Sequence, residues 1–179
     1  MRSWEVPPCR AARCLGVLAL SVTGLAASFS TTELTRSAAR IFRARCVSAR
    51  PVTVDFKGRP LVATAYAFQV TEYLKGEGPR TLTFQQAGTP ERDVTDLGRI
   101  AGLTVFSPGN EYVVFLRPES KAGLTSAAGR GRGVLLVTGE TVRAVEIDGL
   151  TPTPGAESIA YQALRGAVLQ VVREDARRR

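Results

Sequence analysis

The chain has 179 residues, with 24 basic and 16 acidic side chains, three cysteines and no histidine. The absence of histidine excludes a Ser-His-Asp triad, a Cys-His pair and a histidine-based zinc site, and the few cysteines exclude a cysteine-cluster metal site. Catalysis by two carboxylates and calcium binding through oxygen ligands stay open, because both need only Asp and Glu.

The chain begins with the pattern of a secretory leader. Three arginines precede an uncharged apolar run from Leu15 to Ala27, after which small residues follow. This run is shorter than the roughly 20 residues that a helix needs to cross a bilayer. A signal peptide is therefore favoured over a membrane anchor. Cys9 and Cys14 precede the run, so neither fits a lipid anchor, which would follow it.

We therefore predict a signal peptide over residues 1–27 and one domain over residues 28–179, exported to the periplasm or the extracellular space. Once the leader is removed, we expect no membrane span, a net charge of about +6, and Cys46 as the one remaining cysteine. Cys46 alternates with Arg43 and Arg45, which favours an inert core thiol over a reactive thiol or one paired with another chain.

In chain order, the first element is a short helix over residues 31–39, because Ser30 and Glu33 have the spacing of a capping box. Apolar residues then alternate with polar ones, as in a strand with one wet face. This alternation predicts strands over residues 40–48, 62–74 and 80–86. Residues 51–60 are expected to form a turn-rich connection, and the second and third strands a hairpin.

Residues 87–104 lose this period and predict a long loop, of a kind that is usually functional in a compact domain. The apolar run Tyr112–Leu116 predicts a central strand covered on both faces. Two further strands are predicted over residues 134–138 and 141–147, and a helix over residues 157–174. An apolar stripe at helical spacing should pack that helix on the sheet: Ala160, Leu164, Ala167, Val168 and Val171.

About six short strands with helices only at the two ends predict a mainly β fold. We expect a small antiparallel barrel of the oligonucleotide/oligosaccharide-binding (OB) type, or a strongly curved sheet. A short N-terminal helix and a C-terminal helix should pack on it. Closure removes exposed sheet edges, and an end helix can cover the open mouth of such a barrel.

Three stretches in this order resemble a group of uncharacterised secreted bacterial proteins: residues 40–47, 68–76 and 108–116. Those proteins are similar to the barrel of tissue inhibitors of metalloproteinases (TIMPs) and of netrin-type modules. The resemblance covers most of the predicted domain, and its motifs are structural. For example, the pattern from Val70 to Gly76 indicates a strand that ends in a turn, and it is not a catalytic signature.

The resemblance implies an OB-like barrel more strongly than it implies protease inhibition. The eukaryotic inhibitors chelate the zinc of a protease with an amino-terminal cysteine held by disulfides. This chain has neither feature, and a fold alone does not carry a function.

Three local features are candidate sites. The segment Gly129–Gly133 could bind an anion through its amides and the guanidinium groups of Arg130 and Arg132. A strand follows it instead of the helix of a phosphate-binding loop, which favours a flexible connection.

The acidic cluster Glu91, Asp93 and Asp96 could hold calcium, but it lacks the glycine and terminal glutamate of a helix-loop-helix site, which favours a solvated loop. Glu72 and Glu111 could face each other as an acid and base pair. Strand-end carboxylates more often pair with arginines, such as Arg117, or stay hydrated.

The missing catalytic residue types and the barrel pattern favour a non-enzymatic exported binding module whose partner is an extracellular or cell-envelope protein. A secreted TIMP-like protease inhibitor is one alternative, and a binder of polyanions, such as acidic glycans or lipid headgroups, is the other. We expect no cofactor, no metal and no nucleic acid partner.

Overall fold

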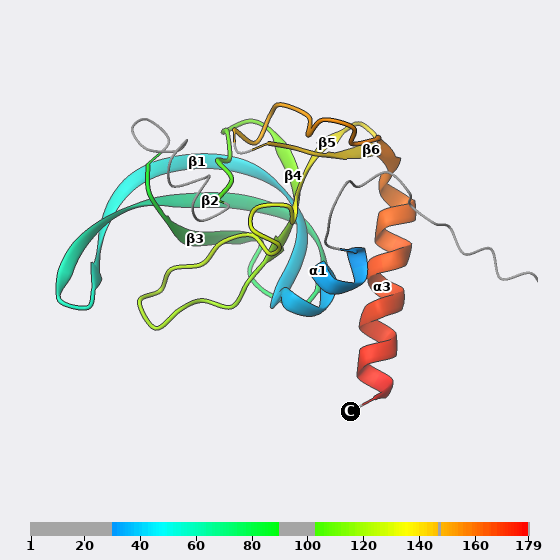
Figure 1. Ribbon diagram of the computed structural model, residues 1–179, viewed down its shortest axis with the longest axis horizontal. Coiled ribbons are helices and arrows are strands. Elements are labelled where there is room, and N and C mark those ends of the chain that lie inside the picture. The colour runs from blue at the N-terminus through cyan, green and yellow to red at the C-terminus, as the bar shows by residue number, and fades with distance from the viewer. Residues whose placement is uncertain (1–29, 90–102, 147, 179) are drawn as a thin grey trace, which may run out of the picture.

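A seven-stranded antiparallel sheet, with one helix before it and one after it in the chain, dominates the computed structural model, which describes residues 30–89, 103–146 and 148–178 (Figure 1). The order across the sheet is β3-β2-β1-β4-β5-β6-β7. The elements are α1 (Thr31–Ser37), β1 (Arg40–Phe56), β2 (Arg59–Lys75), β3 (Thr81–Ala87), β4 (Glu111–Leu116), β5 (Val134–Thr138), β6 (Thr141–Ala144), β7 (Ile159–Ala160) and α3 (Tyr161–Arg177). The predicted mainly β class, with two terminal helices, is confirmed.

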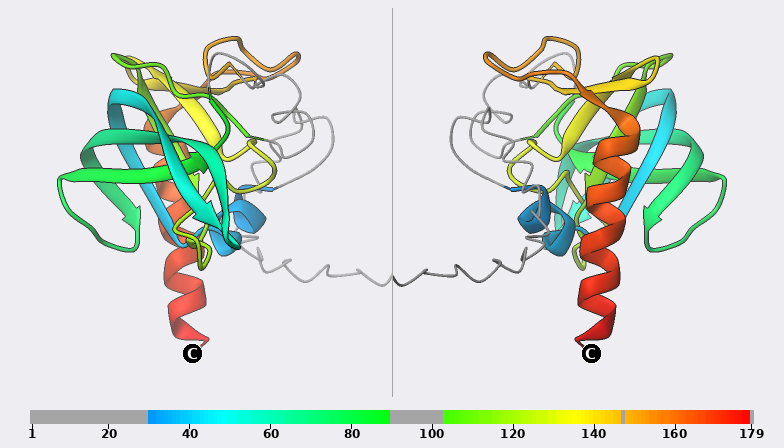
Figure 2. Two further views of the ribbon diagram at one scale, coloured as in Figure 1. Left: turned by 90° about the vertical axis from the view of Figure 1, so that its left-hand side faces the viewer. Right: turned by 90° about the vertical axis from the view of Figure 1, so that its right-hand side faces the viewer.

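The sheet is strongly curved (Figure 2), and its outer strands β3 and β7 do not pair with each other. A segment of the β4–β5 connection bridges β3 and β4 instead. Leu124 forms a parallel bridge with Gln85, and Ala127 an antiparallel bridge with Leu116. The Thr125 N–H donates to the Gln85 carbonyl at 2.8 Å. The wall between β3 and β4 is therefore joined at single residues, as in a partly open barrel.

The β1–β2 hairpin is longer than the sequence pattern predicts. β1 continues to Phe56 and β2 begins at Arg59, so the connection is only Lys57 and Gly58. Both residues have a left-handed φ, of 56° and 76°, as in the two-residue turn that matches the twist of a hairpin. The Asp55 carboxylate accepts the Gly58 N–H at 3.0 Å. The predicted turn over residues 51–60 is therefore wrong.

Pro51 lies inside β1, although proline breaks most strands. β4 pairs with β1 only as far as Arg45, so beyond that point β1 has a strand partner on one side only. Proline is tolerated at such an edge, where its missing N–H breaks no ladder bond. It also makes the edge a poorer template for another strand.

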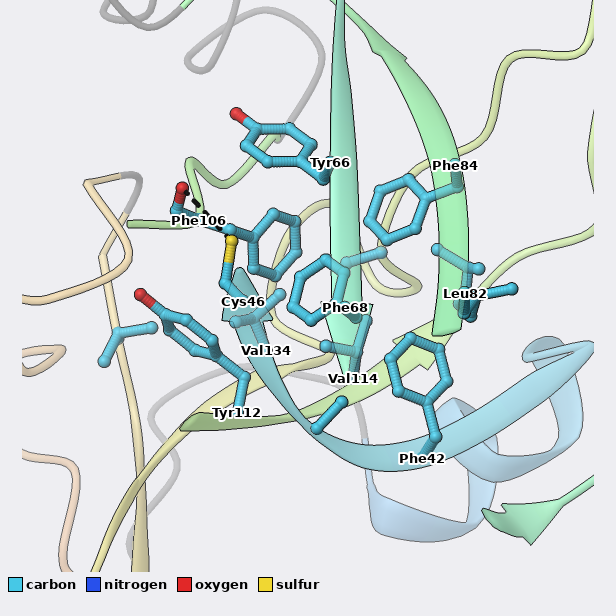
Figure 3. Close-up of a cluster of buried hydrophobic side chains, with 14 residues drawn as sticks. Phe42, Cys46, Tyr66, Phe68, Leu82, Phe84, Phe106, Tyr112, Val114 and Val134 are labelled. Carbon is cyan, nitrogen blue, oxygen red and sulfur yellow. Dashed lines mark hydrogen bonds between the residues drawn. The ribbon is translucent and has the colours of Figure 1, made fainter. Parts of the chain in front are cut away.

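One core lies on the concave side of the sheet (Figure 3). The predicted inward residues of β1, Phe42, Ala44 and Cys46, are fully buried there. Phe106, which lies outside the strands, makes edge-to-face contacts with four rings at centroid distances of 5.0–5.7 Å. Those rings belong to Tyr66, Phe68, Phe84 and Tyr112.

A second core lies on the opposite face of β4 and joins it to α1 and α3. Val113 and Phe115 of β4 share this core with Leu164 and Val168 of α3, which confirms a central strand covered on both faces. The short helix α1 begins with the predicted capping box at Ser30.

The C-terminal helix begins later than predicted, at Tyr161 instead of Glu157. Ile159 is held in β7 by pairing with Val142, and the Tyr161 N–H donates to the Glu140 carbonyl at 2.8 Å, so the chain stays extended until then. The buried residues of the helix are Tyr161, Leu164, Val168 and Val171, whereas Ala160 and Ala167 are exposed. β6 also ends early, at Ala144 instead of Ile147.

Candidate functional site

The two carboxylates considered for acid and base catalysis do not face each other. Glu111 accepts two hydrogen bonds from Arg43, at 2.9 and 3.2 Å. The Arg43 guanidinium lies 4.5 Å from the centre of the Tyr161 ring. The Tyr161 hydroxyl donates to Glu72 at 2.7 Å, and Arg165 pairs with the same carboxylate at 2.7 Å. Arg43 and Tyr161 thus stand between the two acids.

Electrostatics keep Glu72 ionised. The hydrogen bond from Arg165 lowers the pKa of Glu72, against the opposing effect of partial burial. Burial and the acceptor carboxylate raise the pKa of Tyr161, so its hydroxyl remains a donor. A carboxylate with a lowered pKa is a poor general acid at neutral pH. The cluster instead holds α3 against the sheet, because Tyr161 and Arg165 of α3 both contact Glu72 of β2. The partners are Arg165 and Arg43, and not the predicted Arg117.

The glycine-rich segment forms a compact turn. Gly129, Arg130 and Gly131 have left-handed φ values of 63°, 56° and 85°. The Arg132 N–H donates to the Gly129 carbonyl at 3.3 Å, and the Gly133 N–H to the Ala128 carbonyl at 3.0 Å. Two of the amides that an anion would need are thus used inside the turn. The side chains of Arg130 and Arg132 are exposed.

The candidate calcium ligands Glu91, Asp93 and Asp96 lie outside the described residues, so the calcium hypothesis stays untested. Among residues 30–89, 103–146 and 148–178, no group of three or more Cys, Asp or Glu side chains is placed to hold a metal ion.

Cys46 is a buried core thiol, as predicted. It is fully buried and unpaired within the part of the chain that the structure describes. Burial raises its pKa to about 11. Because the thiolate is the reactive form, this thiol is a poor nucleophile at neutral pH.

The end of the β1–β2 hairpin projects from the sheet, on the side away from α3 (Figure 1). Among the described residues, residues 53–62 form strand pairs only with one another, and we call them the arm. At its base the Val62 carbonyl accepts the Gly88 N–H at 3.0 Å. One face of the arm carries Val54 and Leu61, both half-buried, and Phe56. The opposite face carries Val62, which is 52% exposed.

A groove of about 480 Å³ lies where the arm meets the β4–β5 connection. Its apolar lining comes from Phe56, Ala87, Leu103, Pro118 and Leu124, and its polar lining from Arg117, Ser120, Thr125 and Ser126. Arg117 is the charged residue among them. Its guanidinium makes no hydrogen bond or ion pair with the residues that the structure describes.

Sequence reasoning did not find the arm or this groove. The signal was present in β1, where Val52, Thr53 and Val54 are three successive β-branched residues next to Pro51. The groove is lined by segments that lie far apart in the chain, so no local sequence pattern predicts it.

The comparisons with known proteins do not identify a relative. No protein-family model matches this chain, and no curated protein is significantly similar to it. The likeness to TIMP and netrin barrels therefore stays a prediction. Within the described ranges, neither helix has the length and apolarity needed to cross a bilayer.

Proposed function

We propose that this chain is an exported, non-catalytic binding module that recognises a protein of the cell envelope or the extracellular space through its arm. One observation carries this proposal: among the described residues, three of the four large apolar side chains that are exposed lie on the β1–β2 hairpin. Those three are Val47, Phe56 and Val62, and the fourth is Leu150. Two of the three, Phe56 and Val62, belong to the arm, and Val47 lies outside it in β1. Exposed apolar side chains on one protruding element support an interaction site there.

The state of the candidate acids also supports a binding role. Glu72 and Glu111 are both paired with arginine, so neither offers an uncommitted carboxyl group to a substrate. The predicted leader supports export. The partner is expected to contact both faces of the arm, because apolar side chains are present on each.

The test is affinity capture of secreted proteins with the wild-type chain and with a Phe56→Ser, Val62→Thr double variant. The variant should lose the partner and keep its circular dichroism spectrum. Leu150→Ser is the matched control, since Leu150 is equally exposed but lies after β6. Partner capture that is unchanged in the arm variant, or lost equally in the control, would reject the proposal.

A secreted protease inhibitor is the second candidate, and the narrow, exposed tip of the arm favours it. Lys57, at the tip, has a left-handed φ of 56°, so the tip would enter an active site as a turn and not as an extended substrate. Any inhibition should therefore leave the tip uncut. Assays against metalloproteases and serine proteases test this candidate, and no inhibition at micromolar protein removes it.

A further inference from the structure

We infer that the groove beside the arm binds an extended peptide segment in which an acidic side chain is flanked by apolar ones. This inference rests on the proposed function, because Phe56 belongs to both the arm and the groove. It adds the chemistry of the segment that is recognised.

The apolar part of the groove comes from two sides. Phe56, at the end of the arm, is 42% exposed, and Leu124, from the β4–β5 connection, lines the same groove. Leu103 adds to the same wall. A volume of about 480 Å³ is within the range of known ligand pockets, about 300–1,000 Å³. The groove is thus large enough for a few side chains of a peptide.

Charge complementarity selects an acidic segment. Arg117 is exposed at the groove, and its guanidinium has no partner within the described ranges. Guanidinium groups bind carboxylates through two parallel hydrogen bonds, which gives both strength and orientation. The excess of basic over acidic residues in the chain also attracts an acidic partner.

The hydroxyl groups favour a peptide over a fatty acid. The Thr125 hydroxyl donates to the Arg117 carbonyl at 2.7 Å, and the Ser120 hydroxyl oxygen accepts the Leu124 N–H at 3.2 Å. The Ser126 hydroxyl has no such role among the described residues. It can donate to a carbonyl along a peptide backbone, whereas the acceptor oxygens of a fatty acid are confined to the carboxylate that Arg117 would bind. The open, partly polar groove also suits a peptide better than a bare hydrocarbon chain.

The experiment measures fluorescence anisotropy of a labelled peptide of alternating leucine and aspartate, with the full chain as receptor. The control probe has asparagine in place of aspartate. The wild-type chain should bind the aspartate peptide at least about tenfold more tightly than the asparagine peptide, because a charge-assisted pair is lost with the latter. Arg117→Gln should remove that preference.

Lys121→Gln is the matched control variant, because Lys121 is exposed in the same connection but does not line the groove. Its affinity should stay within about twofold of the wild type, as expected for an exposed charge outside the site. Equal losses in both variants would indicate general charge attraction and overturn the inference. So would equal binding of both peptides, or a wild-type dimer in sedimentation that Leu124→Ser dissociates.

The two proposals fail separately. Val62→Thr changes the arm outside the groove, and Arg117→Gln changes the groove outside the arm. If neither peptide binds while capture of a secreted protein still depends on Val62, the groove inference is wrong and the arm remains the interaction site. If the aspartate peptide binds through Arg117 while the arm variant captures secreted proteins as well as the wild type does, the proposed function is wrong.

Discussion

Five side chains link α3 to the sheet in a row of alternating partners: Glu111, Arg43, Tyr161, Glu72 and Arg165. Each of the two acids has an arginine partner, and Tyr161 stands between the two pairs. Removing one side chain of the row leaves its partner without a hydrogen bond. The row should therefore contribute more to the stability of the fold than a single surface ion pair does. At the residue scale, these polar contacts have a structural role, because they hold α3 against the sheet.

Glu72→Gln should destabilise the fold by roughly 1 kcal/mol at neutral pH, a modest value because the carboxylate is partly exposed. The pKa of Glu72 is lowered in the folded chain, chiefly by the hydrogen bond from Arg165. Its stabilisation is therefore complete above the ordinary carboxyl pKa and is lost as the pH falls through the lower, folded value. Urea unfolding of the wild type and the variant between pH 7 and about pH 3 measures how the free energy of unfolding of each depends on pH.

The variant should lose less stability on acidification than the wild type, so the two curves should converge at low pH. Glu119→Gln serves as the control, since Glu119 is exposed. A constant difference between wild type and Glu72→Gln at every pH would contradict an electrostatic role for Glu72.

At the scale of elements, α1 depends on a strand that comes long after it in the sequence. The ammonium group of Lys75, at the end of β2, donates to the carbonyls of Thr35 and Ala38, each at 2.6 Å. These carbonyls are among those left without partners at a helix C-terminus, where a positive charge is also favourable. A seven-residue helix is marginal alone, so this contact helps to hold it.

Lys75→Met should keep much of the side-chain volume while removing the donors. We expect a loss of roughly 1–2 kcal/mol, the usual range for hydrogen bonds from a charged group that is partly buried. Hydrogen exchange should become faster at the Ala38 N–H, which donates to the Leu34 carbonyl at the end of α1. Lys121→Met is the control, and faster exchange throughout the sheet would indicate global destabilisation instead of fraying of α1.

Sequence patterns predict the elements where one face is buried and the other wet. The alternation of Phe42, Ala44 and Cys46 placed the first half of β1 correctly, and the capping box placed α1. The same reasoning failed for the rest of the hairpin. There the strands protrude beyond the core, so burial no longer imposes a contrast between faces. The start of α3 was also missed, because the pairing of Ile159 with Val142 is a tertiary contact.

Across the whole molecule, two cores share the central strand β4. Its residues point alternately into the concave core and into the core beneath the helices. The arm and the groove lie away from α3, so binding there needs no change in the helix packing. The site could not be predicted from the sequence, because Phe56 and Arg117 meet at the groove only through the curvature of the hairpin and the path of the β4–β5 connection.

Net charge is also a property of the whole molecule, and it gives a test of the polyanion alternative. The chain should be retained on heparin, and retention should fall steeply with salt, because bound counterions are released on association. Arg130→Ala with Arg132→Ala should weaken retention no more than Arg173→Ala with Arg177→Ala, which removes the same charge from α3. The reason is local: the glycine-rich turn uses the amides of Arg132 and Gly133 internally. A much larger loss in the first pair would establish a specific anion site there and favour the polyanion alternative over the arm.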